Sequence, residues 1–195
     1  MMMSMSTRSN MSAPVPRRPG SSPRSFSAPR SSRAVRVLAL GVGDKAPAFS
    51  AKDQNGKTVS LSSLQLPIIG KAVVLAFYPS DGSPGCTKEM GAFREAIAEF
   101  KKAGAVVVGV SKGTVESKKE FATDLDLPFT LINDENDEIR TAYGVKAELF
   151  GALPGRETFV IAKDGTIVAR YSDAFGFDKH VLKSLEALEP ATVMA

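Results

Sequence analysis

Cys86 is the only residue of this sequence with a thiol, and its position is typical of a reactive one. It follows the loop-forming residues Ser83, Pro84 and Gly85 and stands at the predicted start of a helix. A helix N-terminus presents unpaired N–H groups and partial positive charge, which favours a thiolate over a thiol. Ser83 adds a hydroxyl that can donate to a sulfur or to a substrate oxygen. The alternative is that Cys86 is a small buried hydrophobic residue, the commonest role of a free cysteine.

Other uses of the thiol are disfavoured by what the sequence lacks. The only histidine, His180, lies in a predicted C-terminal helix, where we expect it at the surface or on a helix flank rather than as a general base for a cysteine nucleophile. A CxxC redox pair is absent because the third residue after Cys86 is Glu89. One cysteine and one distant histidine do not make a typical metal site. We therefore expect no metal and no cofactor.

The chain has 195 residues, enough for one domain and an extension. Hydrophobic residues make up 43% and charged residues 24%, which is ordinary for a globular protein with a full core. No apolar run approaches the roughly 20 residues that a membrane-spanning helix needs, so we expect no membrane association through such a helix. A single cysteine also excludes an intrachain disulfide framework.

The N-terminal segment differs in composition from the rest of the chain. Residues 1–36 hold seven Arg and ten Ser, and the first acidic residue is Asp44. Such Ser- and Arg-rich, acid-free segments are typical of organelle transit peptides. We expect residues 1–38 to be an organelle transit peptide, with a disordered basic tail as the alternative.

The formal net charge of +4 belongs to this extension. Without its seven Arg, the remaining residues hold 18 basic against 21 acidic side chains, a net charge of −3. The basic residues are therefore not clustered in the folded part, and we expect no nucleic-acid partner.

Strand signals recur through the folded part, residues 43–190. Asn55-Gly56 separates the candidate strands 48–51 and 58–61, and Asp164-Gly165 separates 158–162 and 167–171, as in tight hairpins. Residues 72–78 and 105–110 are apolar and rich in β-branched residues, which predicts strands buried on both faces. Residues 129–132 form a further candidate strand.

Helical periodicity predicts four helices. In residues 87–102 the apolar side chains share one face and charged residues, Glu89 among them, largely occupy the other. Thr114 is expected to cap a second helix running to Leu125, and a short third helix is expected near 138–143. The last helix spans about 178–188. The side chains expected to be buried in these helices are Met90, Phe93, Ile97, Phe100, Val115, Phe121, Leu125, Val181, Leu182, Leu185 and Leu188.

The order of these elements predicts the fold class. Strand–helix–strand units imply right-handed crossovers and parallel neighbours, and the late hairpin adds antiparallel strands. We expect an α/β protein with a mixed central β-sheet flanked by helices and an N-terminal β-hairpin.

The segment FYPSDGSPGCTKE resembles the active site of peroxiredoxins, whose pattern Pro-x-x-x-Thr/Ser-x-x-Cys is matched by Pro79, Ser83 and Cys86. Residues 43–64, 127–145 and 151–161 are similar to the peroxiredoxin Q (bacterioferritin comigratory protein) subfamily. The resemblance covers residues 43–190 and implies a thioredoxin-like fold. It also implies a reaction, in which a cysteine thiolate attacks a peroxide O–O bond and becomes a sulfenic acid.

The resemblance assigns roles to four residues. Cys86 attacks, Ser83 hydrogen-bonds the peroxide, Arg156 lies near the sulfur and polarises the substrate, and Pro79 shields the site from water. Plainer interpretations remain for three of them. Pro79 can simply end a strand, Ser83 can be a turn residue, and Arg156 can be a surface arginine.

The sequence departs from the subfamily at Gly91, where many members carry a resolving cysteine five residues after the reactive one. Because the sequence holds no second cysteine, an intramolecular disulfide cannot form, and a sulfenic acid at Cys86 needs an external thiol. A sulfenic acid that is resolved slowly passes more easily to sulfinic acid.

The sequence thus predicts a thiol-dependent peroxidase with a one-cysteine mechanism, acting on hydrogen peroxide and alkyl hydroperoxides. Thioredoxin, glutathione with glutaredoxin, or another small thiol would meet the need for a reductant. The resemblance implies a monomer, located in a chloroplast rather than a mitochondrion. The alternative is a non-catalytic redox sensor or binding protein of thioredoxin fold.

Overall fold

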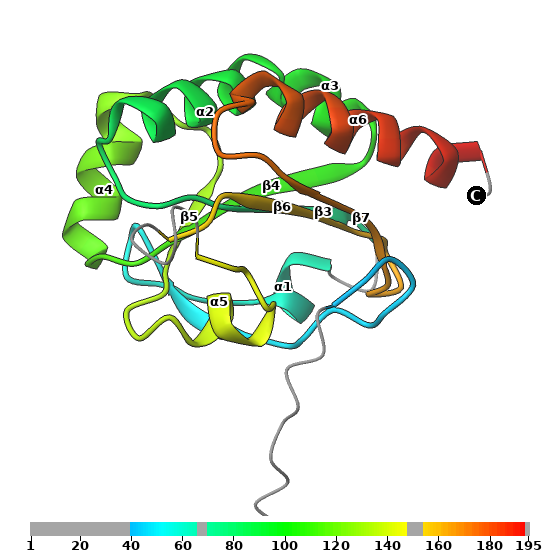
Figure 1. The fold of residues 1–195 in the computed structure, drawn as a ribbon, viewed down its shortest axis with the longest axis horizontal. Coiled ribbons are helices and arrows are strands. Elements are labelled where there is room, and N and C mark those ends of the chain that lie inside the picture. Colours follow the sequence, from blue (N-terminus) through cyan, green and yellow to red (C-terminus); the bar gives the residue numbers. More distant parts are fainter. Residues whose placement is uncertain (1–39, 66–69, 148–153, 194–195) are drawn as a thin grey trace, which may run out of the picture. The chain divides into compact units, whose positions relative to one another are not determined.

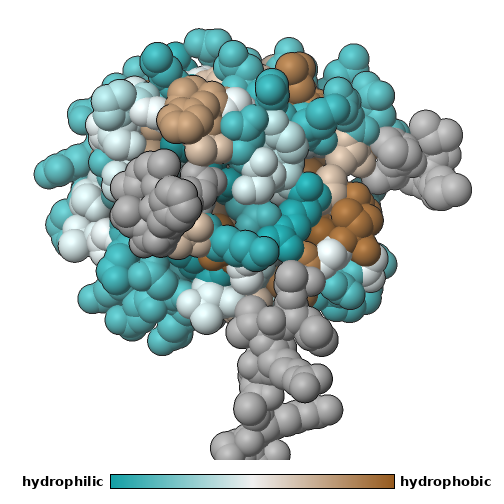
Figure 2. Space-filling view, viewed as in Figure 1, coloured by the Kyte–Doolittle hydropathy of each residue, from teal (hydrophilic) through white to brown (hydrophobic). Residues whose placement is uncertain are grey.

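The computed structural model describes residues 40–65, 70–147 and 154–193. The predicted transit peptide, residues 1–38, lies outside the described residues. No helix in the described ranges is long and apolar enough to cross a membrane. The face shown in Figure 2 is mainly hydrophilic, with apolar residues in separate groups.

Seven strands of the described chain form one mixed sheet in the order β2-β1-β5-β4-β3-β6-β7. β3 is parallel to β4 and β4 to β5, whereas all other neighbours are antiparallel. Both predicted hairpins, β1–β2 and β6–β7, are confirmed. The bounds are β1 Ser50–Asp53, β2 Thr58–Ser60, β3 Ala72–Phe77, β4 Ala105–Ser111, β5 Thr130–Asn133, β6 Glu157–Ile161 and β7 Ile167–Ser172.

Helices cover both faces of the sheet (Figure 1). One face carries α2 (Pro84–Glu95), α3 (Ile97–Lys102), α4 (Val115–Asp124) and α6 (Phe177–Val193); the other carries α1 (Leu61–Gln65) and α5 (Glu138–Ala142). All six residues of β3 are buried, so this central strand must be covered by helices on both faces of the sheet. Val74 packs toward the α2 face and Leu75 toward the α5 face, as alternation along a strand requires.

Two local predictions differ from the structure. The single helix expected over 87–102 is interrupted at Ala96, whose φ of −87° and ψ of 8° separate α2 from α3. The Phe100 amide still donates to the Ala96 carbonyl at 3.2 Å, so the apolar face continues across the break. Leu61, expected to end a strand, instead begins α1, because the Ser60 hydroxyl accepts the Ser63 amide as an N-cap does.

The C-terminal helix exposes and buries residues differently from the prediction. Leu182, expected in the core, is 56% exposed, whereas His180, expected at the surface, is completely buried. Since His180, Ser184 and Leu188 repeat every four residues, they share the face that packs on β6 and β7, and Leu182 points elsewhere. Val115, expected inward, is only half-buried in the first turn of α4.

Candidate active site around Cys86

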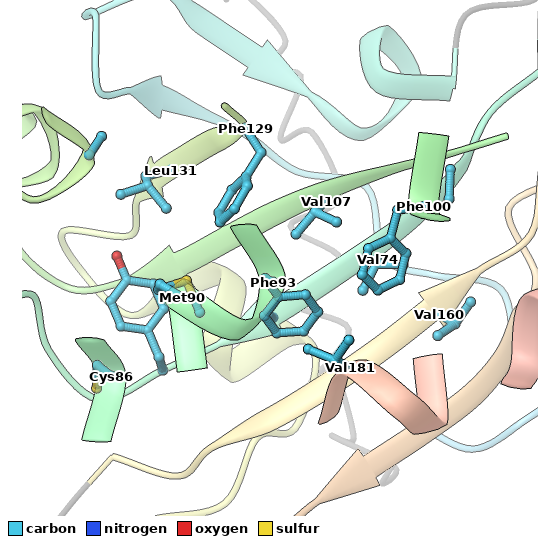
Figure 3. Close-up of a cluster of buried hydrophobic side chains, with 14 of the residues drawn as sticks. Val74, Cys86, Met90, Phe93, Phe100, Val107, Phe129, Leu131, Val160 and Val181 are labelled. Carbon is cyan, nitrogen blue, oxygen red and sulfur yellow. The ribbon is translucent and has the colours of Figure 1, made fainter. Parts of the chain in front are cut away.

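The loop between β3 and α2 sets the position of Cys86. Pro79 lies half-buried just after β3, and Ser83 takes extended φ and ψ angles of −68° and 144° before Pro84 starts the helix. Proline suits this position because the first helical N–H would be unpaired in any case. Cys86 is therefore in the first turn of α2 and is completely buried (Figure 3).

Ser83 does not contact the sulfur through a hydrogen bond in this structure. Its hydroxyl donates to the Ser80 carbonyl at 3.4 Å, and it makes no side-chain cap on α2. The hydroxyl is half-buried in the loop that leads to Cys86. The predicted peroxide contact of Ser83 therefore stays a prediction.

Arg156 lies beside Cys86, and the interpretation as a surface arginine is wrong. The antiparallel register pairs Glu157, the first residue of β6, with Phe77, the last residue of β3. This register brings Arg156 to the end of β3 from which the Cys86 loop departs. Arg156 is only 4% exposed, and its Nη2 donates to Cys86 Sγ at 3.5 Å. A guanidinium here can stabilise negative charge on the sulfur or on a departing oxygen.

Three further contacts hold the Arg156 side chain in place. Nη1 forms an ion pair with Glu89, and Nε donates to the Ala174 carbonyl at 3.2 Å. The Phe177 ring lies 4.8 Å from the guanidinium carbon, within the range of a cation–π contact. The guanidinium is thus fixed by α2, the loop after β7 and the start of α6 together.

Glu89 was predicted on the polar face of its helix, and that prediction is wrong because the side chain is completely buried. The sequence did contain a signal. Glu89 lies three residues after Cys86 and four before Phe93, the spacing of one helical face, and all of this face is buried. A carboxylate on such a face needs a cationic partner, and Arg156 supplies it.

His180 lies next to Glu89 and is completely buried. Its Nδ1 is 2.8 Å from the Thr158 hydroxyl and 3.8 Å from Glu89 Oε1, and its Nε2 is 2.9 Å from the Asp173 carbonyl. A carbonyl only accepts, so Nε2 carries the proton and Nδ1 accepts from Thr158. Burial lowers the pKa of His180, which keeps the ring neutral near pH 7.

Arg140 joins the two segments that carry the site, and sequence reasoning missed it. Its Nη1 donates to the Gly155 carbonyl at 2.6 Å and its Nη2 to the Tyr78 carbonyl at 2.8 Å. Gly155 precedes Arg156, and Tyr78 precedes the loop to Cys86. No local signal marks Arg140, because both of its acceptors are backbone groups distant in sequence.

Asp81 anchors the same loop from the other side. Its carboxylate accepts from the Tyr78 hydroxyl at 2.7 Å, the Ser117 hydroxyl at 2.8 Å and Lys118 Nζ at 2.7 Å. Burial lowers the pKa of Lys118, an effect that its contact with Asp81 opposes. Burial, with the Asp81 charge, raises the pKa of Tyr78, so its hydroxyl remains a donor. The loop before Cys86 is therefore tied to α4.

Comparison with known proteins identifies the family. Residues 42–170 match the model of the AhpC/TSA family. The chain is 45% identical over 161 residues to the chloroplastic peroxiredoxin Q of Suaeda salsa, an alignment covering 83% of this chain and 73% of that protein. The chain belongs to the AhpC/TSA family of peroxiredoxins, in its peroxiredoxin Q branch.

Solved peroxiredoxin structures share the fold. Peroxidoxin BcpB from Mycobacterium tuberculosis superimposes with a TM-score of 0.70 and 34% identity, over 77% of this chain and 97% of that one. The bacterioferritin comigratory protein of Xanthomonas campestris gives 0.62 and 29%, over 71% and 90%. The expected thioredoxin-like fold is confirmed.

Family membership establishes the reaction class. This peroxiredoxin is a thiol-dependent peroxidase, which reduces peroxides at the expense of a thiol. The described ranges contain no group of three or more His, Cys, Asp or Glu side chains that could hold a metal ion.

Proposed function

We propose that this peroxiredoxin uses a one-cysteine mechanism in which Cys86 alone carries the redox cycle. The Cys86 thiolate attacks one oxygen of hydrogen peroxide or an alkyl hydroperoxide, the O–O bond breaks, and water or an alcohol leaves. Arg156 stabilises the charge on the departing oxygen. The observation that carries this proposal is the 3.5 Å approach of Arg156 Nη2 to Cys86 Sγ within a buried site.

Ser83 and Pro79 complete the proposed site. Ser83 leaves its Ser80 contact, which is long at 3.4 Å, and hydrogen-bonds the bound peroxide. Pro79, half-buried between β3 and α2, limits the access of water. Both roles rest on the match to the peroxiredoxin pattern.

The sulfenic acid at Cys86 is reduced by an external thiol, because the sequence holds no second cysteine. Thioredoxin, or glutathione with glutaredoxin, fits this requirement. We further propose that the protein acts as a monomer, with residues 43–190 as its peroxiredoxin domain.

We also propose a chloroplast location, with residues 1–38 removed as a transit peptide. The composition of this segment and the chloroplastic relatives support the assignment. Sequencing the N-terminus of the protein isolated from plastids would test it. A mature protein that retains its Arg-rich segment would instead favour a basic tail.

Steady-state peroxide consumption with thioredoxin or glutathione tests the mechanism. The wild-type protein turns over many equivalents of peroxide, whereas Cys86→Ser consumes none. Because the sequence holds a single cysteine, an alternative function remains, that of a redox sensor that signals through Cys86. A single stoichiometric oxidation of Cys86, with no turnover with either thioredoxin or glutathione, would establish the sensor.

A further inference from the structure

An open groove lies between α2 and the start of α6, next to the helical turn that carries Cys86. Its volume is about 480 Å³, within the range of small-molecule sites. Residues of both helices line it: Thr87, Lys88, Gly91, Ala92, Glu95, Phe177 and Asp178. The first two directly follow Cys86 in the chain.

Gly91 leaves the floor of the groove open. A Cβ built at this position meets no heavy atom within 4 Å, and the next lining residue along the helix, Ala92, is also small. Since any larger residue at Gly91 would project into this space, the groove depends on the very residue that replaces a resolving cysteine.

One aromatic ring separates the groove from the reactive centre. Phe177 contacts the Arg156 guanidinium, and its ring atoms lie 3.0 Å from where a Cβ on Gly85 would be. Phe177 is half-buried, and its side chain both lines the groove and contacts the arginine that bonds Cys86. The groove is thus placed for a molecule that must reach Cys86.

The charges around the groove have both signs. Lys88 and Asp178 are exposed, and neither is in an ion pair within the described residues. Glu95, which is paired with Arg94 at 3.7 Å, also lines the groove and lies seven residues after Lys88. The lining on α2 therefore extends for about 10 Å, the length of an extended tripeptide, and Lys88 and Asp178 supply one charge of each sign for a zwitterion.

We propose that this groove binds the reductant of Cys86, a low-molecular-weight zwitterionic thiol of the glutathione class. The inference rests on the proposed function, because it needs a sulfenic acid at Cys86. Lys88 pairs with a carboxylate of the thiol peptide and Asp178 with its ammonium group, and the thiol is directed past Phe177.

Reduction of the Cys86 sulfenic acid consumes two molecules of the thiol. The first thiolate attacks Cys86 Sγ; an S–S bond forms, the S–O bond breaks, and hydroxide leaves and takes up a proton to become water. A second thiolate attacks the peptide sulfur of this mixed disulfide, which releases the Cys86 thiolate and a peptide disulfide. The sulfenic sulfur is reduced by two electrons, and two thiols are oxidised to one disulfide.

The test compares glutathione with uncharged 2-mercaptoethanol as reductants of the full chain. We expect Lys88→Gln and Asp178→Asn each to raise the half-saturating glutathione concentration about two- to fivefold, as the loss of one exposed ion pair implies. The rate with 2-mercaptoethanol stays within about twofold in both variants. The matched controls Lys102→Gln and Glu120→Gln, on α3 and α4, leave both reductants unaffected. Mass spectrometry of oxidised protein mixed with glutathione shows a glutathionyl adduct on Cys86.

Equal effects of the variants on both thiols, or turnover with thioredoxin and no glutathionyl adduct, would overturn the groove assignment. Stopped-flow oxidation of Cys86 by peroxide, without any reductant, distinguishes a failure of the groove proposal from a failure of the proposed function. If peroxide oxidises Cys86 normally while glutathione fails, only the groove proposal is wrong. If peroxide does not oxidise Cys86, the proposed function is wrong.

Discussion

Glu89 forms a buried ion pair with Arg156, and the same guanidinium donates to Cys86 Sγ. The carboxylate and the sulfur lie on one face of α2, while the arginine comes from the segment before β6. Glu89, which lies on the same helix as Cys86, thus orients the Arg156 guanidinium that contacts the sulfur.

Glu89→Gln tests this arrangement. Removing one charge from a buried pair leaves the other uncompensated, so we expect the free energy of unfolding to fall by about 3 kcal/mol. Peroxide oxidation of Cys86 slows as well, because Arg156 loses one of the contacts that orient it. Urea unfolding and stopped-flow oxidation measure the two effects, with exposed Glu120→Gln as the control. Unchanged oxidation in a destabilised variant would show that Glu89 serves stability alone.

Arg140→Lys tests the link between the two segments of the site. An ammonium group is a compact charge and does not reproduce the planar fork that bonds both Tyr78 and Gly155. We expect peroxide oxidation to slow by about tenfold or more, since small displacements of reacting groups are costly. Arg94→Lys, whose guanidinium bonds a single carbonyl outside the site, is the matched control. Equal oxidation rates in the two variants would contradict a positioning role for Arg140.

Gly91→Cys should restore internal resolution. The space at Gly91 accepts a side chain, but residues five apart in a helix are about 7.5 Å apart along its axis, beyond the reach of a disulfide in an intact α2. We therefore expect a disulfide to form after one equivalent of peroxide, accompanied by a loss of helical circular dichroism. Thiol counting and intact mass detect it. Persistent sulfenic acid in this variant would mean that the start of α2 does not unwind.

Gly91→Ala is the matched control for that experiment. Alanine in place of glycine in a helix interior raises the free energy of unfolding by about 0.5–1 kcal/mol, and no neighbour opposes its Cβ here. Urea unfolding should show this gain, and no disulfide should form.

His180 should make stability depend on pH. Burial lowers its pKa in the folded state, so the unfolded chain binds the proton more readily. The free energy of unfolding therefore rises with pH. As the pH falls below about 6.5, the pKa of histidine in the unfolded chain, the free energy of unfolding decreases by at most about 1.4 kcal/mol per pH unit. Urea unfolding at pH 7.5 and 5.5 should show a smaller difference in His180→Gln than in the wild type. An identical pH dependence in the two proteins would refute this assignment.

Excess peroxide should inactivate the enzyme. Without an internal thiol, the sulfenic acid waits for an external reductant and can react with a second peroxide to give sulfinic acid. Intact mass after excess peroxide should show the addition of two oxygen atoms on Cys86, and added thiol should prevent it. Protein that keeps full activity and gains no such mass would contradict a slowly resolved intermediate.

Local physics allowed much of this fold to be predicted from the sequence. Asn55-Gly56 and Asp164-Gly165 lie in hairpin turns, with φ angles of +73° and +85° at the two glycines. Thr114 caps α4 as expected, with a capping box to Ser117. Each signal acts within a few residues of the chain, so no knowledge of distant neighbours was needed.

One cysteine and its immediate neighbours were enough to predict a candidate nucleophile, its place at the start of a helix and the need for an external thiol. The side chains that surround its sulfur could not be predicted in this way. Glu89, Arg140 and His180 are buried by elements remote in sequence, and each then bonds a group that the sheet register or helix packing brings near. Burial makes such polar groups dependent on partners, and partners are chosen by proximity in space, which local patterns do not encode.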